Sequence, residues 1–250
     1  MHLNVKTAIC TSKVLLVPYS KWHVPQYHEW MKDEEIRLLT ASEPLTLSEE
    51  YGMQESWRGD ADKLTFIVCL PAQESSDGVV ISSSLSDKDD APDQMIGDIN
   101  LFLRMDDGEE GDLEPSIIGE VELMIARSKD QSKGFGRSAL LTFLRYIAGH
   151  EREIVGEFVG KDELASKAKD YTNAGKARLK FSALSVKIGH SNQRSLALFE
   201  SFGFRKVSEE VNYFGEWELR RTALGVEGIE KELTGAGVGG YREVVYERSA

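Results

Sequence analysis

Cysteine is scarce in this chain of 250 residues, because only Cys10 and Cys69 are present. Two cysteines exclude the disulfide framework of small secreted domains, and we expect both side chains to pack in the interior of a protein from a reducing compartment. Long apolar runs are also missing. None approaches the roughly 18 residues of a membrane span, and the N-terminal residues lack a signal-peptide pattern. These absences predict a cytoplasmic protein that can also reach the nucleus by diffusion.

Positive charge is in deficit, with 30 Lys and Arg residues against 42 Asp and Glu residues and a formal net charge of -12. The basic clusters that neutralise nucleic-acid phosphates are absent, which argues against a general nucleic-acid-binding protein. The 5 histidines are scattered, so the sequence predicts no metal site. The acidic balance fits a cationic substrate, and it fits the charged surface of an ordinary soluble protein equally well.

One short stretch carries the strongest chemical signal, Gln-Ser-Lys-Gly-Phe-Gly at residues 131–136. It lies between an alternating apolar run and a helical pattern, so its backbone amides should form the open N-terminus of a helix. Such amides favour a bound anion by about 0.3–1 kcal/mol, or by up to about 2 kcal/mol when partly buried. Lys133 and Arg137 add positive charge beside them. The stretch therefore predicts a cradle for a pyrophosphate group.

Two common nucleotide-binding motifs are missing from this cradle. A Walker loop requires Gly-Lys-Ser/Thr after four spacer residues, and that pattern does not occur here. A Rossmann fingerprint requires a third glycine three residues after Gly136, where Ala139 stands. The cradle also lies in mid-chain, after strands with an antiparallel pattern. Both nucleotide-binding folds are therefore disfavoured.

Hydrophobic periodicity predicts strands and helices along most of the chain. We expect strands at residues 13–19, 63–70, 95–103, 118–126, 182–188, 204–208 and 216–222, and helices at residues 24–33, 46–57, 136–148 and 191–203. A capping box of Thr46 and Glu49 should start the second helix, and Ser191 or Asn192 should cap the last. Of the connections, 73–94 should be a mobile loop, 106–114 an acidic hairpin loop, and 151–180 an inserted helical or flexible segment.

A second motif follows the cradle. Residues 189–195, Gly-His-Ser-Asn-Gln-Arg-Ser, open a helix that ends in Phe-Gly-Phe at 202–204. Together with the cradle, this motif resembles the GCN5-related N-acetyltransferases (GNAT), whose acetyl-CoA site is built from these elements. The resemblance implies a mixed α/β fold whose twisted, mostly antiparallel sheet is splayed in the middle, with helices on both faces. It implies one GNAT domain at residues 1–222, with inserted loops at 73–94 and 151–180 and a C-terminal extension at 223–250.

The resemblance also implies acetyl-CoA as cosubstrate and three groups of residues that contact it. The cradle would hold the pyrophosphate through Gln131, Ser132, Lys133, Gly134, Phe135, Gly136 and Arg137. The preceding strand would meet the thioester carbonyl through a backbone N–H of Met124, Ile125 or Ala126. The second motif would line the pantetheine through Asn192, Ser195 and Phe199.

Five ungapped runs make the resemblance more specific, at residues 17–19, 28–31, 39–47, 97–102 and 119–126. They look like the eukaryotic N-acetyltransferase 9 family, relative to which the two inserted loops are expansions. That family is regarded as acting on protein amino groups, and its animal members are linked to tubulin N-termini and microtubule stability. The resemblance therefore implies acetylation of a protein N-terminal α-amine, with tubulin as the substrate.

Acetyl transfer to an amine needs a neutral nucleophile and a route for the proton that the departing thiolate takes up. The resemblance puts Glu120 at the position of the catalytic glutamate, with Glu122 on the same face of its strand. The alternative role of both carboxylates is to face solvent or to pair with a neighbouring strand. Phe199 stands where the family often has a tyrosine as general acid, so Ser195, a water molecule or the amine itself has to supply that proton.

The choice of acceptor follows from amine basicity. An α-amine titrates near 7.7–8.0 and a lysine near 10.4, so the neutral fraction at pH 7 favours the α-amine by about a few hundred-fold. In the related fold the acceptor site is bordered by the loop at 40–47, which implies substrate contacts for Thr40, Ser42 and Glu43, and also for Asn100. Two other functions stay open: acetylation of a small amine or an internal lysine, and a non-catalytic acetyl-CoA-binding, microtubule-associated module in which Phe199 marks a degenerate site.

Overall fold

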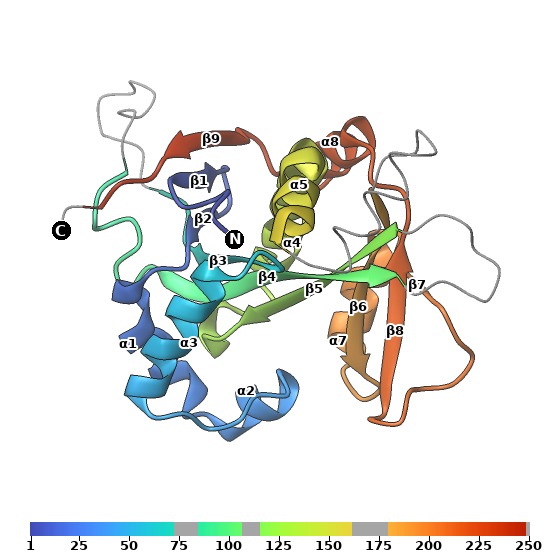
Figure 1. Ribbon diagram of the computed structural model, residues 1–250, viewed down its shortest axis with the longest axis horizontal. Helices are drawn as coiled ribbons and strands as arrows, with labels where there is room; N and C mark the ends of the chain where they lie inside the picture. The colour runs from blue at the N-terminus through green and yellow to red at the C-terminus, as the bar shows by residue number, and fades with distance from the viewer. Residues whose placement is uncertain (73–84, 107–115, 162–179, 249–250) are drawn as a thin grey trace.

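A single mixed sheet organises the chain, of which the computed structural model describes residues 1–72, 85–106, 116–161 and 180–248. Its strands follow the order β7-β8-β6-β5-β4-β3-β2-β1-β9 (Figure 1). They are β1 (Thr7–Cys10), β2 (Leu15–Pro18), β3 (Lys63–Cys69), β4 (Met95–Asp106), β5 (Ser116–Ile125), β6 (Phe181–Gly189), β7 (Arg205–Lys206), β8 (Glu216–Arg221) and β9 (Arg242–Val245). Only β5 and β6 pair in parallel among the described strands. This mostly antiparallel sheet confirms the predicted fold class.

Helices cover both faces of the sheet, as predicted (Figure 1). One face carries α4 (Phe135–Gly149), α5 (Glu151–Lys161), α7 (Gln193–Ser201) and α8 (Val226–Gly235). The other carries α1 (Val24–Met31) and α3 (Leu47–Gly59), and α2 (Glu34–Leu39) lies between these two in sequence. Two short 3-10 helices are η1 (Lys21–His23), directly before α1, and η2 (Ser128–Asp130), between β5 and α4. Within the described part of the chain no helix is both long and apolar enough to cross a membrane.

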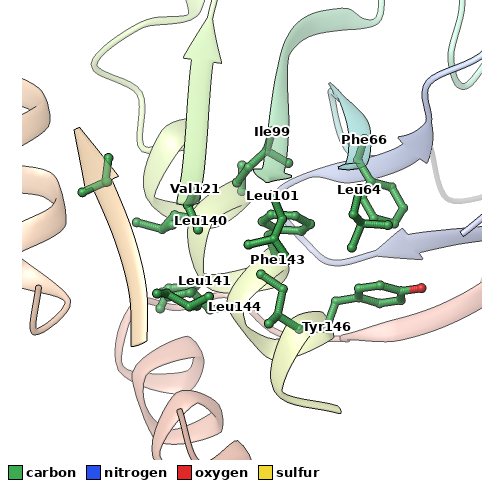
Figure 2. Close-up of a cluster of buried hydrophobic side chains, with 14 of the residues drawn as sticks. Leu64, Phe66, Ile99, Leu101, Val121, Leu140, Leu141, Phe143, Leu144 and Tyr146 are labelled. Carbon is green, nitrogen blue, oxygen red and sulfur yellow. The ribbon is translucent and has the colours of Figure 1, made fainter. Parts of the chain in front are cut away.

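The main core lies between the sheet and α4 (Figure 2). The strands present every second residue to it, and Figure 2 shows Leu64, Phe66, Ile99, Leu101 and Val121 facing Leu140, Phe143 and Tyr146 of the helix. The Phe66 ring meets the Phe143 ring edge-on, with 5.9 Å between the centroids. Burial of each such side chain stabilises the fold by about 1.5–3 kcal/mol. The opposite faces of β4 and β5 are thereby left for polar side chains.

Three helix ends follow the local signals in the sequence. The Thr46 hydroxyl accepts from the Glu49 N–H while the Glu49 carboxylate accepts from the Thr46 N–H, which confirms the capping box of α3. Asn192 caps α7 by accepting from the Ser195 N–H at 3.1 Å. The chain then leaves α7 through Gly203, whose φ of +78° suits glycine.

The sheet edges and the C-terminal segment differ from the sequence prediction. β1 was not predicted, and the strand predicted at 204–208 is reduced to the two residues of β7. The predicted C-terminal extension contains α8, which packs on α4, and β9, which pairs with β1. Of the predicted loops, 85–94 includes the buried Asp90 and 151–161 is the helix α5, whereas 73–84, 107–115 and 162–179 lie outside the described residues.

β1 and β9 have four residues each and β7 has two, which is too short for a clear period-2 pattern in the sequence. The predicted boundary at residue 222 stays a prediction.

Candidate active site

A cavity of about 360 Å³ opens where β5 ends, between the starts of α4 and α7 and the helix α2. Its lining comes from four separate segments: Ile36, Leu39 and Thr40 of α2 and its C-cap; Leu123, Met124 and Ile125 of β5; Gln131, Ser132, Gly134, Gly136 and Arg137 of the cradle; and Asn192, Arg194, Ser195 and Leu198 of α7 and its cap. The fold therefore brings together members of all three groups predicted to contact acetyl-CoA.

The cavity exists because β5 and β6 separate midway along their length. Their parallel pairing ends at Glu120 and Ser185, whereas β6 continues to pair with β8 as far as Gly189. Beyond Glu120, the edge of β5 that faced β6 has no strand partner among the described residues. The backbone groups of such an edge can bind an incoming ligand or chain. The splay predicted in the middle of the sheet is thus present.

The free edge of β5 presents the amide of Ile125. The Ala126 N–H donates to Ile96 O at 2.8 Å and therefore points toward β4. N–H groups alternate in direction along a strand, so the Ile125 N–H points the other way, toward the cavity. The same edge carries Ile125 O, which accepts from Gln131 Nε2 at 2.9 Å. Of the three amides predicted to meet a thioester, that of Ile125 is the one available.

Gly97 makes this strand end possible. It lies opposite Ile125 in the pairing of β4 with β5. A Cβ added to Gly97 would overlap the carbonyl oxygen of Met124, so any other residue would push the two strands apart. The position of the β5 edge beside the cavity therefore depends on the absence of a side chain at residue 97.

The cradle is an open helix N-terminus, as the glycine spacing predicted. Gly134 is the N-cap of α4 with a φ of +87°, and Ser132 also has a positive φ, of 60°. The first backbone bond of the helix runs from the Ser138 N–H to Gly134 O at 3.0 Å. The amides of Phe135, Gly136 and Arg137 come before that bond and have no acceptor within the helix. Such amides, at the positive end of a helix dipole, suit an anion.

The positively charged side chains around the cradle differ in the groups that they contact. Arg127 and Lys133 both pair with the buried Asp130, at 2.6 and 3.5 Å. The Arg137 guanidinium lies over the Phe202 ring, 5.1 Å from its centroid. The Arg194 guanidinium donates to two neutral groups of the cradle, the Gln131 side-chain amide oxygen and the Ser132 hydroxyl.

The two glutamates predicted to be catalytic have different surroundings. Glu120 forms an ion pair with Lys187, with 2.8 Å between Oε2 and Nζ. Among the described residues Glu122 has no hydrogen-bond or ion-pair partner, and its side chain is open to solvent. The protein around Glu122 still desolvates it in part, and the carboxylates of Asp98 and Glu120 repel its charge. Together these effects raise the pKa of Glu122 to about 7.

A third carboxylate, that of Asp98, lies on β4, the strand that pairs with β5. Asp98 is buried on the same face of β4 as Asn100, which pairs directly with Glu122 across the strands. Asp98 Oδ2 accepts from Asn100 Nδ2 at 2.9 Å and from the Tyr27 hydroxyl at 3.4 Å. Burial dominates over these bonds and raises the pKa of Asp98 to about 6. Asn100 Oδ1 is buried and has no partner within the part of the chain that the structure describes, so it could accept a hydrogen bond from a ligand.

The loop predicted to contact the acceptor meets the cavity through one of its three predicted residues. Thr40 lines the cavity and its hydroxyl bonds the Ser42 hydroxyl at 2.9 Å. Ser42 lies behind Thr40, and Glu43 is exposed. Their proposed contacts with an acceptor stay predictions.

Four predicted cofactor residues do not line the cavity. Phe199 belongs to the core, where its ring meets that of Phe204 edge-on at 5.1 Å. Lys133 pairs with Asp130. Phe135 at the start of α4 is partly buried, and Ala126, directly after β5, is buried. Conversely, sequence reasoning gave no role to Leu123, Leu198, Arg194, Ile36 or Leu39, which do line it. Helical spacing from Ser195 identifies Leu198 in retrospect, but nothing in the sequence pointed to α2.

Known proteins give an independent comparison. Residues 13–205 match the model of the acetyltransferase (GNAT) domain family. The N-acetyltransferase 9-like protein of Schizosaccharomyces pombe is 39% identical over 242 residues, which are 89% of this chain and 100% of that protein. The alpha/beta-tubulin-N-acetyltransferase 9 of Drosophila melanogaster is 41% identical over 221 residues, covering 88% of this chain and 89% of that protein.

A solved structure shares the fold. The spermidine N-acetyltransferase from Vibrio cholerae, in complex with CoA and spermine, covers 84% of this chain and 94% of its own, with a TM-score of 0.50 and 16% identity. At that identity the likeness concerns the fold alone.

Proposed function

Because the chain belongs to the GNAT acetyltransferase family, we propose that it transfers the acetyl group of acetyl-CoA to the N-terminal α-amine of a protein, with tubulin as the acceptor. It is an N-acetyltransferase similar to the N-acetyltransferase 9 proteins. The tubulin assignment comes from the names of relatives such as the Drosophila protein. The rest of the proposal is supported by the geometry of the cavity and of the polar face beside it.

One observation carries the cofactor assignment: the free edge of β5 and the open N-terminus of α4 border the same cavity. A CoA thioester has an anionic pyrophosphate at one end and a carbonyl at the other, joined by an extended amide chain. The amides at the cradle suit the pyrophosphate, the free backbone edge suits the amide chain, and the Ile125 N–H suits the carbonyl oxygen. The thioester supplies the acetyl group.

The acceptor amine has to lose a proton to react, and Glu122 is the base that the geometry favours. Glu120 pairs with Lys187, whereas Glu122 is exposed and has no ion-pair partner among the residues described, with a pKa of about 7. Transfer of a proton from an α-ammonium to Glu122 is nearly balanced, because the α-amine titrates at about 7.7–8.0. Transfer from a lysine, at about 10.4, is uphill by roughly three pKa units, or about 4–5 kcal/mol. This difference favours the α-amine.

A polypeptide acceptor is supported by the apolar residues around the cavity. Leu39 lines the cavity and is 61% exposed, and its neighbour Leu38 is 76% exposed. Tyr213 and Phe214 are 96% and 80% exposed on the turn before β8, and Gly215 O of that turn accepts from the His190 N–H, three residues before α7. A small amine would not need such side chains, whereas the residues that follow a protein N-terminus can pack on them.

A panel of acceptors tests this function. The purified protein would be incubated with acetyl-CoA and four acceptors: a tubulin N-terminal peptide, the same peptide with a blocked N-terminus and an internal lysine, a polyamine, and a free amino acid. Mass spectrometry should find acetyl transfer mainly to the free α-amine of the first peptide. Faster transfer to the blocked peptide or the polyamine would overturn the α-amine assignment, and binding of CoA without any product would indicate a non-catalytic module.

A further inference from the structure

Arg194 reaches across the cavity from α7 to the cradle. It is exposed and is the second residue of the helix. Its guanidinium donates to the Ser132 hydroxyl at 2.9 Å and to Gln131 Oε1 at 3.5 Å. Gln131 is itself fixed, because its amide nitrogen donates to Ile125 O. Arg194 therefore lines the same cavity as the start of α4 and contacts the loop that leads into that helix.

The charge of Arg194 is not neutralised. Within the described part of the chain it has no carboxylate partner, unlike Arg127 and Lys133, which share Asp130. Its two acceptors are a hydroxyl and an amide oxygen, and hydrogen bonds between exposed groups of this kind are easily exchanged for bonds to an anion. A planar guanidinium matches two oxygens of one phosphate, which a single ammonium cannot do.

The cradle residue that Arg194 contacts is also strained. Ser132 has a φ of 60°, in the left-handed region that a residue with a side chain rarely adopts. Such a conformation costs about 1 kcal/mol or more, and residues held in this way cluster at ligand-binding sites. The contact with Arg194 holds the Ser132 hydroxyl at the rim of the cavity, on the side where an anion would enter.

We propose that Arg194 is the second half of the anion clamp, gripping the pyrophosphate of the acyl carrier from α7 while the amides of α4 hold it from the other side. This inference rests on the proposed function, because acetyl-CoA is the carrier that function requires. In the free protein the guanidinium bonds Ser132 and Gln131, and it exchanges both for phosphate oxygens when the carrier binds. Residues 131–136 alone would be half of the phosphate site.

Calorimetric titration of CoA and dephospho-CoA into the full-length protein tests the clamp. Dephospho-CoA keeps the pyrophosphate and lacks the 3′-phosphate, so Arg194→Ala should weaken both ligands by about 10- to 100-fold. Arg194→Lys should recover part of this loss, because it keeps the charge but not the two-pronged geometry. Lys129→Ala removes an exposed charge near the cradle without touching α7, and should change either affinity by less than about twofold.

The outcomes separate the possible failures. A loss for CoA without a loss for dephospho-CoA would show that Arg194 binds the 3′-phosphate, and equal losses in Arg194→Ala and Lys129→Ala would reduce its role to general electrostatics. Either result overturns the clamp, as does an unchanged affinity in Arg194→Ala. If the wild-type protein itself binds neither ligand, the proposed function fails with it, and that result is visible before any variant is measured.

Discussion

The cavity, or cofactor side, and the polar face of β4 and β5 beside it, or acceptor side, present different chemical groups. The cofactor side, made of the β5 edge at Ile125, the cradle at residues 131–136 and the start of α7, presents backbone amides and carbonyls together with the Arg194 guanidinium. The acceptor side, made of Asp98, Asn100, Glu120 and Glu122, presents side chains whose charge states depend on burial and on each other. Ligand binding on the cofactor side depends mainly on backbone geometry, whereas proton transfer on the acceptor side depends on the electrostatic environment of the carboxylates. Substitutions should therefore affect binding on one side and chemistry on the other.

The largest effect is expected at Gly134. Gly134→Asp places a side chain at a φ of +87° and a negative charge at the N-terminus of α4, where the pyrophosphate would bind. CoA affinity, measured by calorimetry, should fall by more than about 100-fold, with the circular dichroism spectrum preserved. Gly156→Asp is the matched control, since that glycine is exposed on α5 with open space around it. Equal losses in both variants would contradict the backbone account of the cofactor side.

The next effect concerns Glu122 and should leave CoA binding unchanged. Glu122→Gln removes the base, so kcat should fall by about 10²- to 10⁴-fold. The wild-type rate should rise with pH through about 7, because Glu122 accepts a proton only when ionised, and the variant should lose this dependence. Glu120→Gln is the matched comparison and should lose much less activity, because that carboxylate already pairs with Lys187. A reversed order of the two losses would assign the base to Glu120.

A smaller effect is expected from the apolar rim. Leu39→Glu removes an exposed apolar contact beside the cavity and should raise the KM for a peptide or protein acceptor by about fivefold, since covering the exposed part of a leucine contributes about 1 kcal/mol. The KM for acetyl-CoA should not change. Val245→Glu introduces the same carboxylate at an exposed apolar residue of β9, and should leave the steady-state kinetic constants unchanged. A loss shared by peptide and small-amine acceptors would mean that Leu39 supports the cavity and not the acceptor.

The smallest effect is on stability. Burial raises the pKa of Asp98 from 3.8 to about 6, so the folded state favours its protonated form. This contribution to stability is complete below pH 4 and is lost as the pH rises through about 6. Asp98→Asn should therefore raise the free energy of unfolding at pH 7 by on the order of 1 kcal/mol, with little change at pH 4. Urea denaturation at both pH values measures it, and destabilisation at pH 7 would contradict this view of Asp98.

The contrast between the two sides also explains what the sequence could reveal. Gly134 and Gly136 are visible in the sequence because a backbone site requires residues without side chains at fixed spacing. Asn192 is visible because a helix cap has its own local pattern. Local rules of this kind are independent of the rest of the fold, so the cradle and the α7 cap both appear in the structure as expected.

The acceptor side could not be derived in the same way. Alternation places Glu120 and Glu122 on one face of β5, but only the register with β6 shows that Lys187 reaches Glu120 and leaves Glu122 free. Likewise, the raised pKa of Asp98 depends on burial below Tyr27, from a helix more than sixty residues away in the chain. The contribution of α2 to the cavity is a tertiary contact with no local signal at all.

The measurement that tests the central claim most directly is the position of the acetyl group on tubulin. Purified tubulin would be incubated with acetyl-CoA and either the wild-type protein or Glu122→Gln, and the products would be digested and sequenced by tandem mass spectrometry. The account predicts acetyl groups on the N-terminal α-amine with the wild-type protein, and a loss of at least about 100-fold with the variant. Acetylation confined to lysine side chains, or equal α-amine acetylation by both proteins, would contradict it.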